Sequence, residues 1–254
     1  MTDTYRRRRN TVLGLVLSAC LIFLIYAGVT TFRETEVEIA PIETIELDDD
    51  DTEFNYLGEE VGDQPLAINE LGKLAVREWA SHSGYSRNQF LTSGNWNKWG
   101  NGCNVREKIL GRDLDEILYD DNGCTVMSGI LHDPYTGKVI HFTRGAGSSS
   151  AVQIDHVVAL SNAWSTGAQD LDQATRNALA NDDLNLLAVD GPANQQKSDS
   201  DASQWLPPNQ SFRCEYIARQ IAVKIKYLLW VTQSERNAMQ NTLETCSGQT
   251  MPAQ

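Results

Sequence analysis

Basic residues are scarce in this sequence. Lysine and arginine together number 21 against 34 aspartates and glutamates, which gives a formal net charge of −13. Such a composition argues against a protein that binds polyanions through a broad basic surface. Much of the acidity is local, because residues 33–63 hold thirteen acidic residues and one arginine. These like charges, with no hydrophobic periodicity among them, predict an extended and disordered acidic tether.

Charge is absent from residues 11–32, an apolar segment preceded by four consecutive arginines. About 20 apolar residues suffice to cross a bilayer, and flanking positive charge stays on the cytoplasmic side. We therefore expect a cytoplasmic N-terminus at residues 1–10, a transmembrane anchor at 11–32, and a single-pass membrane protein whose remaining residues lie outside the cell. A cleaved signal peptide, which would give a secreted protein, and a lipoprotein signal ending at Cys20 are the alternatives.

The sequence also lacks a C-x-x-C pair, the spacing typical of zinc sites. Four of its five cysteines lie in the part expected outside the cytoplasm: Cys103, Cys124, Cys214 and Cys246. An even number of cysteines in an oxidising compartment predicts two disulfides. Of the three connectivities we favour Cys103–Cys124 and Cys214–Cys246, which join neighbours in sequence and would brace the two ends of the domain.

No internal repeat is visible in residues 64–254, which we interpret as one domain. Hydrophobic spacing predicts helices over residues 65–81, 105–118 and 210–230, and strands over 125–130, 139–143 and 185–189. Thr232-x-x-Glu235 is a capping box that predicts the start of a last helix, reaching Cys246. A further strand is expected to end at Asp155-His156, and a helix to begin near Asn194.

The dipeptide Asp155-His156 places an acid beside a histidine at the end of an apolar run. A neutral imidazole can take a proton from water, so His156 is the candidate general base. Asp155 and Asn194 offer a carboxylate and an amide oxygen, which suit a hard cation such as Mg²⁺. A buried structural histidine is the alternative for His156 taken alone, and the asparagine motifs downstream argue against it.

Three stretches together resemble the HNH (His-Me finger) endonucleases: D-H-V-V-A-L at 155–160, N-L-L-A-V-D at 185–190 and N-Q-Q-K-S-D at 194–199. Residues 103–246 are more specifically similar to an exported bacterial subgroup, through C-N-V-R-E-K-I-L-G-R-D-L at 103–114, G-I-L-H-D-P-Y-T-G-K at 129–138, W-L-P-P-N at 205–209 and F-R-C-E-Y-I-A-R-Q-I-A-V-K at 212–224. The third motif position is Asn194 instead of the second histidine, a departure that bears on the metal preference.

The resemblance implies an α+β fold with a ββα-metal core at residues 151–210 and flanking helices. It assigns His156 and Asn185 to the catalytic site, with Asn185 positioning the loop that carries the histidine. It further implies that Asp155 and Asn194 hold one divalent cation, Mg²⁺ in the first place, with Mn²⁺ or Zn²⁺ as alternatives.

Four cations are expected to contact substrate phosphates. Lys197 and Arg144 lie beside the motifs, and Arg106 and Arg112 recur in the pattern of the exported subgroup. A salt-bridged helix surface is the alternative interpretation for Arg106 and Arg112.

These features together predict a metal-dependent endonuclease that hydrolyses DNA, with RNA as an alternative substrate, outside the cytoplasm. Cleavage is expected to be largely nonspecific, because the sequence contains no helix-turn-helix or zinc-finger pattern. The expected partners are nucleic acid and, through residues 11–32, the membrane; no protein partner is evident. The alternatives are a catalytically inactive envelope protein that binds through the same fold, and a phosphodiesterase acting on envelope polymers.

Overall fold

The computed structural model describes residues 64–91, 96–99 and 103–253. The predicted cytoplasmic N-terminus, membrane anchor and acidic tether, which together cover residues 1–63, lie outside the described residues. Among the helices that the structure describes, none is long and apolar enough to span a bilayer.

The described chain is mixed α+β, as the sequence predicts. Its helices, besides short 3-10 turns, are α2 (Ala67–Leu71), α3 (Val105–Asp113), α4 (Leu160–Ser165), α5 (Gln173–Asn181), α6 (Gly191–Lys197), α7 (Arg213–Lys226) and α8 (Gln233–Leu243). Its strands are β1 (Lys98–Trp99), β2 (Cys103–Asn104), β3 (Leu114–Tyr119), β4 (Val126–His132), β5 (Val139–Thr143), β6 (Val152–His156) and β7 (Leu186–Asp190). All pairings are antiparallel: a three-stranded sheet in the order β3-β4-β5, and the two-stranded pairs β1-β2 and β6-β7.

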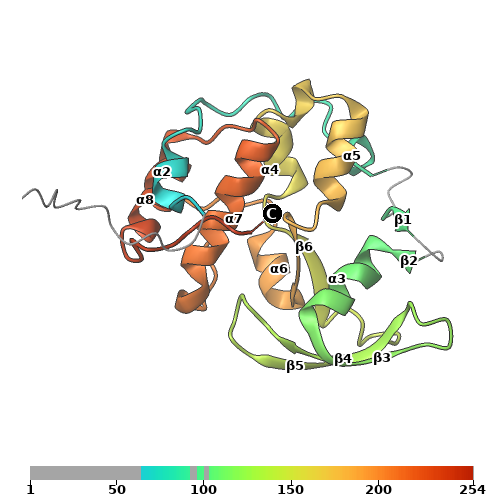
Figure 1. The fold of residues 1–254 in the computed structure, drawn as a ribbon. Helices are drawn as coiled ribbons and strands as arrows, with labels where there is room; N and C mark the ends of the chain where they lie inside the picture. The colour runs from blue at the N-terminus through green and yellow to red at the C-terminus, as the bar shows by residue number, and fades with distance from the viewer. Residues whose placement is uncertain (1–63, 92–95, 100–102, 254) are drawn as a thin grey trace, which may run out of the picture. The chain divides into compact units, whose positions relative to one another are not determined.

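The pair β6-β7, followed directly by α6, lies in the middle of the domain (Figure 1). Helices α7, α8 and α2 lie to one side of it, and α3 with the β3-β4-β5 sheet lies to the other. All five residues of β7 are buried. Leu186 and Ala188 belong to the core cluster with α3 and the sheet, whereas Leu187 and Val189 belong to the cluster with α7 and α8. The first four residues of the strand are apolar, as expected for a strand covered on both faces.

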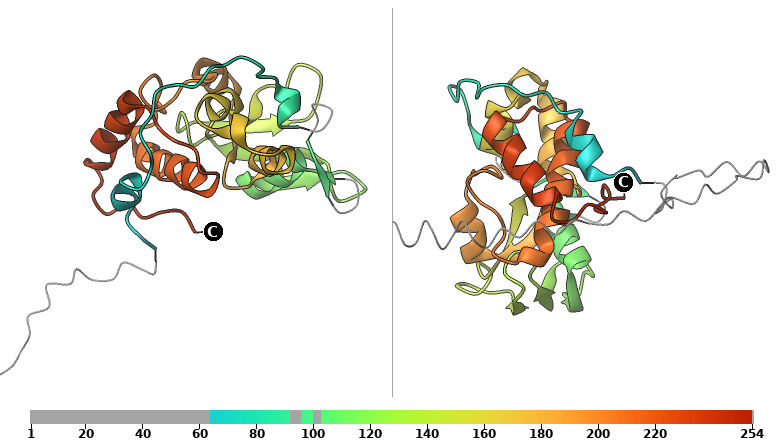
Figure 2. Two further views of the ribbon diagram at one scale, coloured as in Figure 1. Left: turned by 90° about the horizontal axis from the view of Figure 1, so that it is seen from above. Right: turned by 90° about the vertical axis from the view of Figure 1, so that its left-hand side faces the viewer.

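The short helix α2 packs against α7 and α8 (Figure 2). Thr232 caps α8 as predicted, since its hydroxyl accepts from the Glu235 backbone N–H at 3.1 Å. Lys224 of α7 and Glu235 of α8 form a fully buried ion pair, with Nζ 3.0 Å from Oε1. This pair ties the two helices together in the interior.

Several predicted helix boundaries are wrong: the helix expected over 210–230 covers Arg213–Lys226, and the last helix ends at Leu243 and not at Cys246. The helix expected over 65–81 ends at Leu71, because the following residues hydrogen-bond to a distant segment: the Val231 N–H donates to the Ala75 carbonyl, and its carbonyl accepts from Arg77, both at 3.0 Å. The helix expected to reach residue 118 ends at Asp113, where the chain continues as β3. The helix expected near Asn194 begins at Gly191, capped by Asp190.

The two disulfides join Cys103 to Cys124 and Cys214 to Cys246. These are the pairings that we favoured from the sequence. The first joins β2 to the turn before β4, and the second joins the start of α7 to the segment after α8.

Gly191 has no room for a side chain, because a Cβ there would lie 2.1 Å from the Ser150 carbonyl oxygen. Its own N–H donates to the Ala151 carbonyl at 2.9 Å, so the start of α6 is fixed against the chain entering β6. We predict that Gly191→Ala lowers the free energy of unfolding by about 1–3 kcal/mol, the usual cost of forcing atoms into a packed interior.

Urea unfolding of the full-length protein would measure this loss. Gly248→Ala is the matched control, because no atom lies within 4 Å of a Cβ at that position. Equal unfolding midpoints for the two variants would contradict the close approach at Gly191.

Candidate active site

Asp155 is held in place by two buried donors on separate elements. The Lys197 ammonium, on α6, donates to Oδ1 at 3.0 Å, and the Tyr135 hydroxyl donates to Oδ2 at 2.5 Å. Lys197 also donates to the His156 carbonyl at 2.9 Å, and its side chain is 0% exposed. Burial raises the pKa of Asp155, and the two donors oppose that shift by favouring the ionised carboxylate. The orientation of the Asp155 carboxylate is therefore fixed, and the Lys197 ammonium balances its negative charge.

Tyr135 belongs to the turn D-P-Y-T-G between β4 and β5, and the sequence W-L-P-P-N packs against it. The Trp205 ring meets the Tyr135 ring edge-on, with centroids 5.0 Å apart. The Asn209 N–H donates to the Tyr135 carbonyl at 2.9 Å, and the Asn209 side chain donates to the Pro134 carbonyl at 3.0 Å. The D-P-Y-T-G turn and the W-L-P-P-N stretch thus act together to position one hydroxyl against Asp155.

His156 ends β6, buried against α5. Its Nε2 lies 2.9 Å from the Ala180 carbonyl oxygen, which can only accept a hydrogen bond. Nε2 therefore carries the ring proton, and Nδ1 keeps a lone pair. The Trp96 ring stacks on the imidazole, with centroids 5.3 Å apart and planes 18° apart. Burial lowers the pKa of His156 to about 3, so the ring is neutral at neutral pH.

Asn185 fixes the loop that follows the histidine. Its Oδ1 accepts from the Val158 N–H at 2.8 Å, and its Nδ2 donates to the carbonyls of Val158 and Leu179, each at 3.3 Å. The side chain is fully buried and does not line the pocket described below. Its contacts fit the positioning role expected from the sequence.

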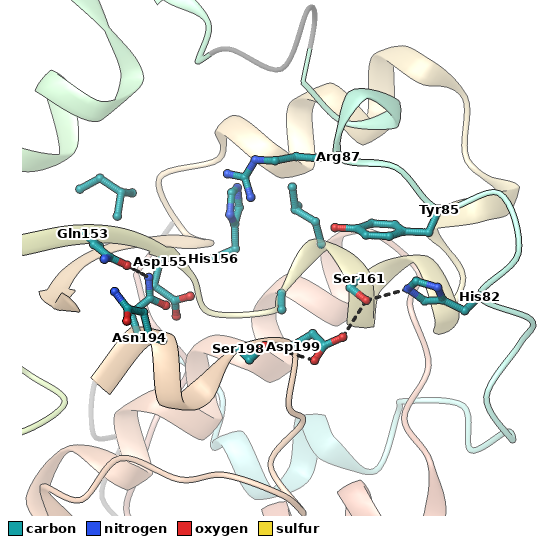
Figure 3. Close-up of a pocket in the computed structure, with 14 residues that line it drawn as sticks. His82, Tyr85, Arg87, Gln153, Asp155, His156, Ser161, Asn194, Ser198 and Asp199 are labelled. Carbon is teal, nitrogen blue, oxygen red and sulfur yellow. Dashed lines mark hydrogen bonds between the residues drawn. The ribbon is translucent and has the colours of Figure 1, made fainter. Parts of the chain in front are cut away.

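Asp155, His156 and Asn194 line one pocket of about 570 Å³ at the end of β6 (Figure 3). The Asn194 Nδ2 donates to the Gln153 Oε1 at 2.9 Å. Among the described residues none donates to the Asn194 Oδ1, which leaves this oxygen for a cation or water. The three side chains that the sequence assigns to catalysis and metal binding are therefore brought together.

The four cations expected to bind phosphate do not line this pocket. Lys197 is engaged by Asp155, and Arg144 pairs with the buried Glu107 at 2.6 Å. Arg106 donates to the carbonyls of Ser149 and Val152, and Arg112 donates to Asp113 and to the carbonyls of Asp183 and Leu186. These contacts brace the strands and α3, so the phosphate role predicted for the four is not supported by their positions.

Arg87 is a pocket cation that the sequence analysis missed. It lies in the 3-10 turn Arg87–Gln89, and Figure 3 shows its guanidinium directed toward His156. Its charge contributes to the lowered pKa of His156, and it lies 6.0 Å from the Trp96 ring centroid. No carboxylate among the described residues pairs with it. Arg87 and Trp96 lie outside every motif, so no sequence pattern pointed to them.

Residues 85–242 match the family described as the C-terminal domain of GmrSD restriction endonucleases. The chain belongs to this family. The predicted membership of a nuclease family is therefore confirmed. The matched region contains Asp155, His156, Asn185 and Asn194, together with Arg87 and Tyr135.

This member of the GmrSD C-terminal domain family is also similar to an uncharacterized secreted protein of the fungus Arthroderma benhamiae. The two are 39% identical over 178 residues, which cover 69% of this chain and 82% of the fungal protein. No solved structure matches the chain.

The Lys197–Asp155 pair generates a prediction about stability in this family member. Lys197→Met keeps the volume but leaves a buried carboxylate without its counter-ion, so we expect the free energy of unfolding to fall by about 3–5 kcal/mol. Adding Asp155→Asn removes the unpaired charge, and the double variant should recover part of that loss.

Urea unfolding would measure both effects, with Lys138→Met as the control, since Lys138 is exposed. A Lys197→Met variant as stable as that control would contradict the buried pair. A double variant less stable than Lys197→Met would do the same.

Proposed function

We propose that this protein is an endonuclease of the HNH (His-Me finger) type, which uses one divalent cation to hydrolyse phosphodiester bonds in DNA, with RNA as an alternative substrate. The observation that carries the proposal is the state of His156: a neutral imidazole whose Nδ1 lone pair has no partner among the described residues, beside Asp155 and Asn194 in one pocket. The order of β6, β7 and α6 around these residues is the order expected for a ββα core.

The donor set fits Mg²⁺ or Mn²⁺ better than Zn²⁺. The described residues contain no group of three or more His, Cys, Asp or Glu side chains that could hold a metal ion, whereas zinc in proteins takes three or four such ligands. Mg²⁺ keeps several waters and needs only one or two protein oxygens. Asp155 retains unused lone pairs after accepting from Lys197 and Tyr135, and Asn194 supplies the second oxygen.

The proposed reaction is an attack by water on phosphorus. The oxygen of the attacking water bonds to phosphorus while the His156 Nδ1 accepts a proton from that water. The bond from phosphorus to O3′ then breaks. The cation would stabilise the negative charge that develops on the phosphate and on O3′. Arg87, in the same pocket, orients the phosphate with its guanidinium. The departing O3′ takes a proton from solvent, which leaves 5′-phosphate and 3′-hydroxyl ends.

We further propose that the domain works outside the cytoplasm, as in the exported bacterial subgroup that its motifs resemble. The two disulfides support an oxidising compartment, and the fungal relative is described as secreted. Anchorage through residues 11–32, or release after cleavage there, remains part of this proposal.

Cleavage by the full-length protein should require both the cation and His156. We predict that it nicks supercoiled plasmid in Mg²⁺ and stops in EDTA. His156→Gln, which fills similar space and can still donate to the Ala180 carbonyl, should cleave about 10²–10⁴-fold more slowly, because it removes the general base.

His141→Gln is the matched control, since His141 is exposed on β5. Circular dichroism would verify that both variants fold. Nicking by His156→Gln at the wild-type rate would contradict the assignment. A wild-type protein that binds plasmid without nicking it would favour the inactive binding protein, and one that cleaves only small phosphodiesters would favour the envelope phosphodiesterase.

A further inference from the structure

The pocket extends well beyond the catalytic residues, and its far end carries a second polar group. Figure 3 shows Gln153, Asp155, His156 and Asn194 gathered at one end, with His82, Ser161 and Asp199 at the other. We call these last three the distal cluster. His82 lies in the segment after α2, Ser161 lies in α4, and Asp199 lies two residues after the end of α6. None of the three takes part in the proposed hydrolysis.

The hydrogen bonds of the distal cluster fix which atoms donate. The Ser161 hydroxyl has one proton and gives it to the Asp199 Oδ2 at 3.0 Å. Its oxygen therefore accepts from the His82 Nε2 at 2.9 Å. With its proton committed to Asp199 and not to His82, Ser161 is not arranged as a nucleophile activated by histidine. We therefore interpret the distal cluster as a group that binds a ligand and takes no part in catalysis.

The distal cluster offers a ligand hydrogen-bond acceptors, chiefly the oxygens of the Asp199 carboxylate. Among the described residues, the Asp199 carboxylate accepts only from Ser161 and, at 3.5 Å, from Ser198, and it is exposed. One further ring lies beside the cluster: the Tyr85 ring centroid is 4.8 Å from that of His82, and Figure 3 shows the Tyr85 hydroxyl turned into the pocket.

This chemistry complements a nucleobase and repels a phosphate. A carboxylate disfavours the phosphate backbone, whereas amino and imino groups of a base donate to it, and an aromatic ring can stack on a base of any sequence. Since the proposed reaction places the phosphate beside Arg87 and His156 in the same pocket, the distal cluster is open to a base that neighbours the cleaved bond. In a duplex the donors of the pairing edge are already used, so the base must be unpaired.

We propose that the distal cluster is a binding subsite for an unpaired nucleobase with donor groups on its edge, and that it makes single-stranded nucleic acid the preferred substrate. Guanine, with an imino and an amino donor side by side, fits Asp199 best, and thymine, with one imino donor, fits less well. A pocket of about 570 Å³ is in the range that encloses small ligands. The substrate preference rests on the proposed nuclease function, whereas nucleotide binding does not.

Calorimetric titration of the full-length protein in EDTA tests the subsite without any cleavage. Deoxyguanosine 5′-monophosphate should bind about tenfold more tightly than thymidine 5′-monophosphate, and both more tightly than inorganic phosphate. Asp199→Asn should remove the guanine preference while leaving the affinity for inorganic phosphate equal or higher, because a negative charge is lost. The matched control is Asp121→Asn, an exposed acid in the β3-β4 turn, which should behave as wild type.

Equal affinity for the two nucleotides, or a guanine preference that survives in Asp199→Asn, would overturn the subsite whether or not the protein cleaves nucleic acid. A preference that depends on Asp199 in a protein that cleaves nothing would support the subsite and count against the nuclease function alone. If the protein does cleave, a single strand should be cut at least tenfold faster than its duplex; equal rates would overturn the proposed strand preference.

Discussion

The buried ion pair between Lys197 and Asp155 is the contact on which the rest of the site depends. It joins the end of β6 to the end of α6, and the same ammonium reaches the His156 carbonyl. A charged pair of this kind is costly to bury unless further hydrogen bonds support it, and here Tyr135 donates to the second carboxylate oxygen. The Lys197 side chain thus orients the Asp155 carboxylate and holds the backbone at His156 in place.

The surrounding fold explains why the site needs few charged residues to hold its geometry. β7 is covered on both faces, and α6 starts where only glycine fits. Asn185 holds the loop after the histidine by two hydrogen bonds to Val158 and joins it to α5 by a third, to Leu179. The imidazole is then fixed by Ala180 on one side and Trp96 on its face. Packing and hydrogen bonds thus set the geometry of a pocket that contains a neutral imidazole, the Asp155 carboxylate and the Arg87 guanidinium.

The sequence predicted what depends on local pattern and missed what depends on distant partners. The strand ending at His156, the apolar strand after Asn185 and the Thr232 cap are short-range signals, and each is present. The helix over 65–81 failed because residues near Ala75 pair with a segment more than 150 positions away. Asp155 and Asn194 could be expected at one site because their motifs resemble those of the HNH family, whereas Arg87 enters the pocket from a segment with no motif. The four predicted phosphate ligands have partners that only the folded chain brings near.

The central claim is that Asp155 and Asn194 hold a divalent cation beside His156, and a Mn²⁺ titration followed by electron paramagnetic resonance tests it most directly. The full-length protein should bind one Mn²⁺ at the site. Asn194→Ala and Asp155→Asn should each weaken that binding at least tenfold, whereas His156→Gln should leave it unchanged, since the base is not a ligand. Wild-type Mn²⁺ affinity in both ligand variants, or its loss in His156→Gln alone, would contradict the account.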